Sequence, residues 1–165
     1  MTDAVIVSTA RTALTKSGRG TFNNTHGITM GSHALQHAIE RAGVDPADIE
    51  DVIFGAGYPE GATGFNVGRN IAMAAGCPTS TSGMTVNRYC SSGLQAIAIA
   101  AGRIRTDGVP VAAAGGVESI SLIQMNGSLN RTHATEKALF ARMPALWMTM
   151  IETAEIVADR YNVSR

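Results

Sequence analysis

Residues 86–96 read VNRYCSSGLQA, and this stretch decides how the chain folds because it joins a strand to a helix through a short turn. Residues 84–86 have the apolar and β-branched composition of a buried strand, and the small residues Ser91, Ser92 and Gly93 open a helical segment. Cys90 stands at the junction. A strand followed by a turn and a helix is the repeating element of α/β folds.

The same alternation extends upstream of this stretch. The β-branched run at 5–7 and the run at 52–54 predict buried strands. Between them, apolar residues recur at helical spacing from Ile28 to Ala42, and Gly43 is a typical helix stop. A glycine-rich loop at 55–64 and a short helix near 67–75 then lead back to the strand at 84–86.

Downstream, residues 91–104 predict a helix that places Leu94, Ile97, Ala98 and Ala101 on one face. Asp107 and Gly108 then turn the chain into a strand at 109–114. Strands that alternate with helices imply a largely parallel sheet with helices packed on it. We therefore predict an α/β fold with a mixed, mostly parallel sheet covered by helices.

The pattern changes after Glu118. No periodicity is sustained until a helix at 150–161, so we expect a core domain at 1–118 and the beginning of another domain at 119–165.

Composition excludes several classes of protein. Of the 165 residues 45% are hydrophobic, which is enough for a sizeable core, and 13 basic residues balance 13 acidic ones without a run of one sign. This predicts no nucleic-acid or anionic-membrane partner. The apolar run near the start is short and no stretch approaches the roughly 20 apolar residues of a membrane span, so a cytoplasmic location is expected.

Cys90 is the candidate nucleophile. The amide groups and dipole at the start of a helix stabilise a thiolate, and small neighbours leave room for an acyl group and for backbone donors to a developing oxyanion. Spacing alone is equally compatible with a small buried apolar residue, because free cysteines are commonly buried.

The other candidates are weaker. Gly55 and Gly57 suggest a dinucleotide-binding turn, but Pro59 and Glu60 follow where the helix with its third glycine is required. His33 and His37 are one turn apart but lack an evident third metal ligand, so no metal site is predicted. Three other side chains receive no catalytic role: His26, His133 and Cys77, of which Cys77 is expected to pack in a turn before Pro78.

Several segments in register resemble thiolases. They are RTA at 11–13, DPADIEDVIFG at 45–55, VNRYCSSGLQA at 86–96, GGVESIS at 115–121, and TAE at 153–155 with YNVSR at 161–165. The resemblance implies a thiolase fold, a CoA thioester substrate, Cys90 as the residue that is acylated and deacylated, and no metal or redox cofactor. It favours a thiolase over the related ketoacyl synthases.

The resemblance covers only the N-terminal half of a thiolase. It implies that 119–165 begin the CoA-binding and tetramerisation loop domain, and that the C-terminal domain, with its water-positioning Asn, its His in a Gly-His-Pro setting and its second Cys, is absent. Met150 matches a Met that many biosynthetic thiolases present to the CoA thioester, while Thr149 stands where those relatives have His. Met150 is therefore a candidate substrate-binding residue, although a Met on a helix is also a common packing residue.

The sequence thus predicts an acyl-CoA C-acyltransferase that cleaves 3-oxoacyl-CoA or condenses acyl-CoAs. Its expected partners are acyl-CoA or CoA, the C-terminal half of the thiolase, and further copies in a homodimer or homotetramer. The alternative is a thiolase-like fragment without activity that serves as a binding or assembly module.

Overall fold

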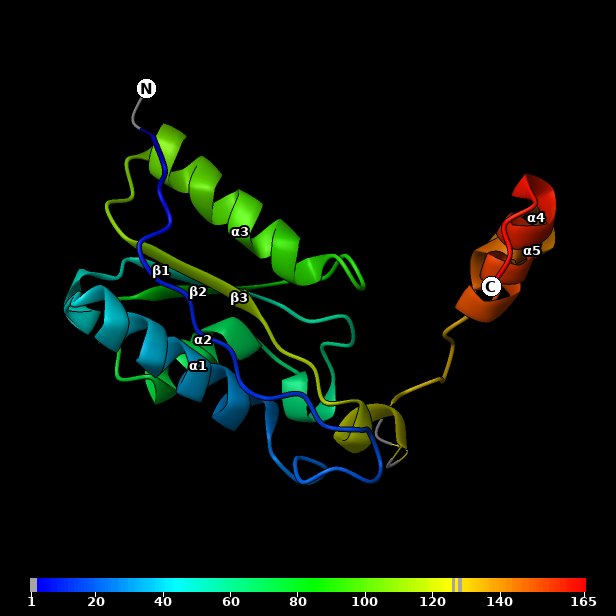
Figure 1. Cartoon of the computed structure of the whole chain (residues 1–165), viewed down its shortest axis with the longest axis horizontal. Helices are drawn as coiled ribbons and strands as arrows, with labels where there is room; N and C mark the ends of the chain where they lie inside the picture. Colours follow the sequence, from blue (N-terminus) through cyan, green and yellow to red (C-terminus); the bar gives the residue numbers. More distant parts are fainter. Residues whose placement is uncertain (1–2, 126, 128) are drawn as a thin grey trace. The chain divides into compact units, whose positions relative to one another are not determined.

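The computed structural model describes residues 3–125, 127 and 129–165, and the chain forms two compact units, Met1–Leu129 and Asn130–Arg165. The segment after Glu118 therefore stays with the first unit as far as Leu129. Figure 1 labels the helices and strands of both units.

A parallel sheet lies at the centre of the first unit, as the α/β prediction requires. Its strands among the described residues are β1 (Asp51–Gly55), β2 (Ser82–Val86) and β3 (Ala112–Gly116), in the order β2-β1-β3. Gly55 at the end of β1 pairs with Val86 of β2 and with Gly116 of β3, so the three carboxyl ends are level. Every residue of β1 is buried, as expected of a central strand that is covered on both faces.

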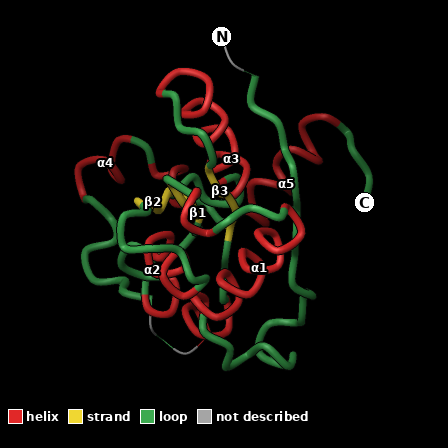
Figure 2. Tube along the Cα trace, turned by 90° about the vertical axis from the view of Figure 1, so that its left-hand side faces the viewer, coloured by secondary structure: helices red, strands yellow, loops and turns green. Residues whose placement is uncertain are grey.

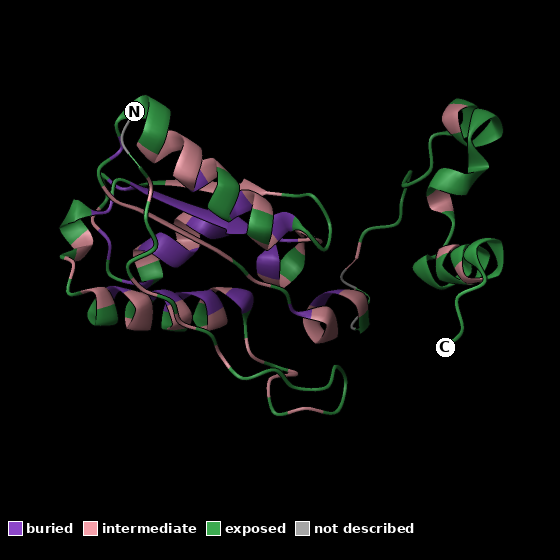
Figure 3. Cartoon of the chain, turned by 45° about the horizontal axis from the view of Figure 1, so that its top comes forward, coloured by how far each residue is buried: buried purple, intermediate pink, exposed green. Residues whose placement is uncertain are grey.

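Helices cover both faces of this sheet. Helices α1 (Gly27–Ala42) and α2 (Val67–Ala74) lie on one face and α3 (Ser92–Gly102) on the other, as Figure 1 shows, while Figure 2 places the strands in yellow between the helices. The side chains of β1 alternate accordingly: Val52 and Phe54 pack with α1 and α2, and Ile53 packs with α3. Figure 3 shows this buried centre in purple.

The helix limits follow from local capping. The Nδ1 atom of His26 accepts a hydrogen bond from the amide of Ile28 at the start of α1, and Gly43 ends the helix in the left-handed conformation at φ 65°. Asn66 caps α2 by accepting from the amide of Arg69. The predicted end of α1 at Ala42, with Gly43 as the stop, is thus confirmed.

Helix α3 is buried on a different side from the apolar face that carries Leu94 and Ile97. Its buried residues are Ser92, Ala96 and Ala100, whereas Leu94 is 71% exposed and Ile97 is 42% exposed. The cause is the short distance between α3 and the sheet: a Cβ built on Gly55 would lie 2.2 Å from the carbonyl carbon of Ser92. Only small side chains fit where the elements approach this closely, so Ser92, Ala96 and Ala100 face the sheet. Ile99 packs partly against this core, whereas Leu94 and Ile97 line the groove described below.

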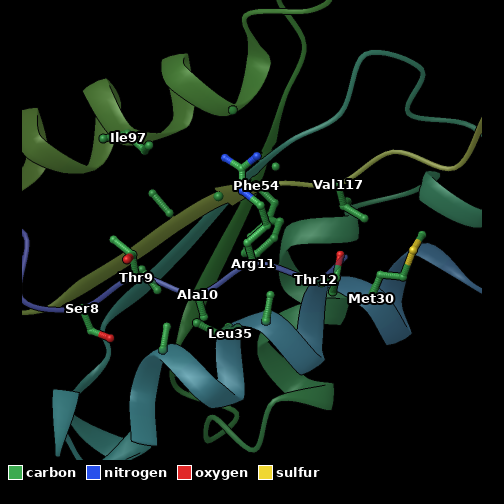
Figure 4. A pocket seen from close by; sticks show the side chains of 18 of the residues that line it. Ser8, Thr9, Ala10, Arg11, Thr12, Met30, Leu35, Phe54, Ile97 and Val117 are labelled. Carbon is green, nitrogen blue, oxygen red and sulfur yellow. The ribbon is translucent and has the colours of Figure 1, made fainter. Parts of the chain in front are cut away.

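The predicted strand at 5–7 is wrong. Val5, Ile6 and Val7 are extended but lie outside the sheet, with exposed fractions of 72%, 76% and 70%. A groove of about 1350 Å³ lies between this segment and the apolar surface formed by α1, α3 and β3. Figure 4 shows residues 8–12 passing across the groove, with Leu35, Phe54 and Ile97 among its lining residues. Among the described residues β3 pairs only with β1, and residues 5–7 form no ladder with its other edge.

The strand predicted at 109–114 begins and ends later, at Ala112 and Gly116. The amide of Val109 is engaged with the carbonyl of Arg103, and Pro110 has no amide hydrogen to offer a sheet.

The second unit contains α4 (Lys137–Arg142) and α5 (Met150–Tyr161). Thr149 and Glu152 form a capping box at the start of α5, and the rings of Phe140 and Trp147 meet edge to face at 5.5 Å. Neither helix has a buried residue (Figure 3). Single turns complete the chain: Pro46–Asp48, Gly61–Thr63, Arg103–Asp107, Ser121–Met125 and Pro144–Trp147.

Across the described residues, every helix is too short or too polar to cross a lipid bilayer.

Candidate active site

Cys90 lies where the sequence places it, in the turn between β2 and α3, and it is exposed. The turn is at the carboxyl edge of the parallel sheet, the edge at which open α/β sheets usually bind their ligands. Its exposure leaves the thiol accessible at this edge in the chain described here.

Side chains of the turn itself hold its backbone. The amide of Arg88 donates to Oγ of Ser92 over 2.8 Å, and that hydroxyl donates to the carbonyl oxygen of Tyr89 over 2.5 Å. Oδ1 of Asn87 accepts from the amide of Tyr89 over 2.9 Å. Ser91 donates to the carbonyl oxygen of Arg88 over 2.8 Å. The turn at 87–92 is thus held by the short polar side chains of Asn87, Ser91 and Ser92.

Tyr89 adopts a left-handed backbone conformation at φ 47°, which is uncommon for a residue with a bulky side chain. Such conformations persist where the surroundings fix them, and they are frequent at functional sites. Tyr89, the residue that precedes Cys90, is therefore held in a strained geometry by the hydrogen bonds of the turn.

Glycines allow the start of α3 to sit directly on the strand ends. A Cβ on Gly55 would collide with Ser92, and a Cβ on Gly93 would lie 3.6 Å from the Cα of Gly116. The first turn of α3 therefore contacts the ends of both β1 and β3.

Glu118 is a functional candidate that the sequence did not single out. It follows β3, and its Oε2 accepts from the amides of Gly57 and Tyr58 over 2.7 and 3.3 Å. Burial of the carboxyl raises its pKa, although the hydrogen bonds from the amides of Gly57, Tyr58 and Ser119 act in the opposite direction. The residue lies within GGVESIS at 115–121, but that motif gives no indication that the carboxylate reaches the loop after β1.

The histidines of the first unit contact residues of α1. His26 caps α1, while His33 and His37 contact each other edge to face at 4.5 Å on that helix, where Nδ1 of His37 is 3.2 Å from Oε2 of Glu40. His133 belongs to the second unit. Within the described ranges, no group of three or more His, Cys, Asp or Glu side chains could hold a metal ion.

Cys77 is buried in the core beside α2, and burial raises the pKa of its thiol. This fits the packing role expected from the sequence. Met150 lies in the first turn of α5 in the second unit and is 76% exposed.

The groove beside β3 lies next to the turn but does not include Cys90. Gly93, Leu94 and Glu118 line it. A smaller cavity of about 210 Å³ lies beside the turn and is lined by Arg88, Ser91, Leu94, Gln95 and Ala98. Arg88 donates a hydrogen bond to Oε1 of Gln95 at its edge.

Together these features define a class of protein: an α/β protein with an exposed cysteine at the start of a helix on the carboxyl edge of a parallel sheet. Residues 4–165 match the family described as "Thiolase, N-terminal domain". The chain belongs to the thiolase family and corresponds to its N-terminal part.

Individual relatives agree. The chain is 42% identical to the 3-ketoacyl-CoA thiolase of Bacillus subtilis, over all of the chain and 41% of that protein. It is 36% identical to the acetyl-CoA acetyltransferase of Cupriavidus necator, over all of the chain and 44% of that protein. The chain therefore spans about two fifths of the length of these curated relatives.

A solved structure shares the fold. The Acat5 thiolase from Ascaris suum, in complex with coenzyme A, superposes with a TM-score of 0.69 at 32% sequence identity, over 73% of this chain and 31% of that one.

Proposed function

We propose that this chain supplies the nucleophile of an acyl-CoA C-acyltransferase of the thiolase type. The whole enzyme would cleave 3-oxoacyl-CoA with CoA and, in the reverse direction, condense acyl-CoAs. The observation that carries the proposal is the exposed Cys90 in the turn just before α3, in a chain of the thiolase family.

The chemistry needs a cysteine thiolate and backbone donors. With acetyl-CoA as donor, Sγ of Cys90 forms a bond to the thioester carbonyl carbon, and the carbonyl oxygen takes up the negative charge. Backbone amides near the start of α3, including that of Cys90, stabilise this oxyanion. The bond from carbon to the CoA sulfur then breaks, the CoA thiolate leaves, and a second CoA species accepts the acyl group. Coenzyme A is a substrate here, and no metal or redox cofactor is part of the proposal.

The remaining acid-base groups would come from the rest of the protein. The chain spans about two fifths of its relatives, and the described histidines are engaged elsewhere or belong to the second unit. The expected partner is the C-terminal half of the thiolase, within a homodimer or homotetramer. The CoA complex of the Ascaris suum thiolase supports CoA as the ligand of the assembled enzyme.

Met150 remains the candidate for contact with the acyl-CoA. Its exposed position at the start of α5 leaves the side chain free to meet a ligand. Thr149, by contrast, is engaged in the capping box with Glu152, so its hydroxyl serves the helix. Replacing Met150 with Ala in the assembled enzyme should raise KM for the acyl-CoA with little change in kcat, whereas a pure packing role predicts no change in KM.

The alternative is a binding or assembly module without activity. The exposed apolar residues Leu94 and Ile97 on α3 favour it, because an uncovered apolar face promotes association with another protein surface.

Intact mass spectrometry before and after exposure to acetyl-CoA separates the two functions. A single acetyl adduct that maps to Cys90, disappears in Cys90→Ser and persists in Cys77→Ser supports the acyltransferase. The assay is run on the chain alone and with the C-terminal half of a related thiolase. Absence of an adduct in both would exclude the acyltransferase for this chain and leave the binding module.

A further inference from the structure

Glu118 bridges two elements that are far apart in the sequence. It follows β3, and its Oε2 accepts hydrogen bonds from the amides of Gly57 and Tyr58 in the loop after β1. The loop is also held from within, because Thr63 is fully buried and its hydroxyl donates to the carbonyl oxygen of Tyr58 over 2.7 Å. The position of Gly57 is therefore fixed by these contacts.

Gly57 in turn touches the residue before the nucleophile. A Cβ built on Gly57 would lie 2.9 Å from Oε2 of Glu118, 3.6 Å from the carbonyl oxygen of Tyr89 and 3.7 Å from the carbonyl carbon of Tyr89. Those two atoms of Tyr89 belong to the peptide group whose nitrogen is the amide of Cys90. Gly57 thus lies next to both the Glu118 carboxylate and the peptide that joins Tyr89 to Cys90.

The same peptide is held from its other side. The carbonyl oxygen of Tyr89 accepts from Oγ of Ser92 over 2.5 Å and from the amide of Ser92 over 3.0 Å. Because Tyr89 is in the left-handed region, its conformation depends on such contacts. The orientation of the Cys90 amide is set by this peptide, since the carbonyl and the amide hydrogen of a trans peptide share one plane and point in opposite directions.

We propose that Glu118 is a positioning residue that acts through Gly57 on the peptide between Tyr89 and Cys90, and thereby directs the Cys90 amide toward the oxyanion formed during acyl transfer. The inference rests on the proposed function of Cys90 as the acylated nucleophile. Glu118 takes no part in bond making or breaking. Its carboxylate serves as an acceptor that holds the loop at 57–58 against the turn.

The test compares two reactions of Cys90 in the full chain, together with the C-terminal half of a related thiolase if acylation requires it. Acylation by acetyl-CoA forms an oxyanion, whereas alkylation by iodoacetamide does not. Both rates are measured by mass spectrometry in the wild type, Glu118→Ala and Glu118→Gln. The control is Asp45→Ala. The carboxylate of Asp45 also accepts a hydrogen bond from a backbone amide, that of Ala47, but it lies ahead of the amino end of β1.

Loss of an oxyanion donor costs about 100- to 1,000-fold in rate, and a misdirected donor should cost less, so we expect acylation to fall about tenfold in Glu118→Ala. Alkylation should change less than about twofold, and Glu118→Gln should restore acylation because its amide oxygen still accepts. Asp45→Ala should leave the ratio of the two rates unchanged. An equal loss of both rates in Glu118→Ala, or no loss, would overturn the proposal.

Amide hydrogen exchange separates failure of this inference from failure of the proposed function. If wild-type Cys90 is not acylated, the acyltransferase proposal fails, but Glu118→Ala must still speed exchange at the amides of Gly57 and Ser92, which donate to Glu118 and to the Tyr89 carbonyl oxygen, relative to Glu118→Gln and Asp45→Ala. Unchanged exchange at Ser92 would refute the positioning role whatever the acylation result.

Discussion

The carboxylate of Asp51, at the start of the central strand, lies 2.7 Å from Nη1 of Arg103, which follows the last residue of α3. Asp51 is buried, and its other oxygen accepts from Oγ of Ser82 over 2.8 Å. The pair therefore ties α3 to β1 at the end of the sheet opposite to Cys90. Removing the cation would leave a buried carboxylate without its counter-charge.

Replacing Arg103 with Met should accordingly destabilise the first unit. Breaking a buried ion pair from one side costs about 3–5 kcal/mol, and we expect the lower end, about 3 kcal/mol, because solvent reaches part of Arg103. Urea unfolding followed by circular dichroism measures the loss. Arg105→Met, which removes a nearby exposed cation, is the control. Equal midpoints for the two variants would show that the pair contributes nothing.

The close contact between Gly55 and Ser92 makes a second prediction. Gly55→Ala would place a Cβ 2.2 Å from the carbonyl carbon of Ser92, so α3 must move away from the sheet. Overpacking costs about 1–3 kcal/mol, and we expect the upper end because the clash is with backbone. Alkylation of Cys90 should change as well, since α3 begins next to it.

Gly102→Ala is the matched control for Gly55→Ala. Gly102 is the last residue of α3, and a Cβ there would meet nothing within 4 Å. Glycine within a helix is less stable than alanine by roughly 0.5–1 kcal/mol, so this variant should be neutral or slightly stabilised. A loss of stability equal to that of Gly55→Ala would show that close packing is not the cause.

The two cysteines should differ in reactivity. Cys90 is exposed, whereas Cys77 is buried in the core and burial raises the pKa of its thiol. Because the thiolate is the reactive form, iodoacetamide at neutral pH should modify Cys90 at least about tenfold faster. Peptide mapping without urea and in urea checks this: the rates should converge only once the chain unfolds. Rapid modification of Cys77 in the folded chain would contradict the burial found here.

The sequence predicts the layers of the fold because β1 and its neighbours carry strong local signals. The apolar run at 52–54, the helical spacing from Ile28 to Ala42 and the stop at Gly43 each specify structure through nearby residues. The turn that carries Cys90 is predicted for the same reason, since the segment 87–92 is held by its own side chains. The α/β class and the position of this turn could therefore be predicted, while the role of Cys90 as nucleophile stays a prediction.

What the sequence could not predict depends on tertiary distances. The buried face of α3 is set by the approach of Ser92 to Gly55, so Ala96 and Ala100 are buried while Leu94 and Ile97 are exposed. Residues 5–7 have strand composition but pair with none of the strands β1, β2 and β3. The sequence argues against a dinucleotide-binding turn at Gly57, but it does not indicate that this residue lies beside Glu118 and Tyr89. Such contacts between distant segments leave no local pattern.

The final prediction concerns pH and Glu118. Because burial raises the pKa of this carboxyl above its ordinary value of 4.5, the folded state binds the proton more tightly than the unfolded state. Stability linked to Glu118 is therefore fully present below the ordinary pKa and is lost as pH rises through the raised value. Glu118→Gln does not titrate and keeps an acceptor for the amides of Gly57 and Tyr58.

The stability of the wild type relative to Glu118→Gln should therefore fall as pH increases from about 4 to about 7. The change should stay below about 1 kcal/mol, because solvent screens a partly exposed charge. Urea unfolding of both proteins across this range measures it. If the free energies of unfolding of the two proteins change in parallel with pH, burial does not raise the pKa of Glu118 overall. If the wild type gains stability over Glu118→Gln as pH rises, the amide hydrogen bonds outweigh burial and the folded chain favours the carboxylate.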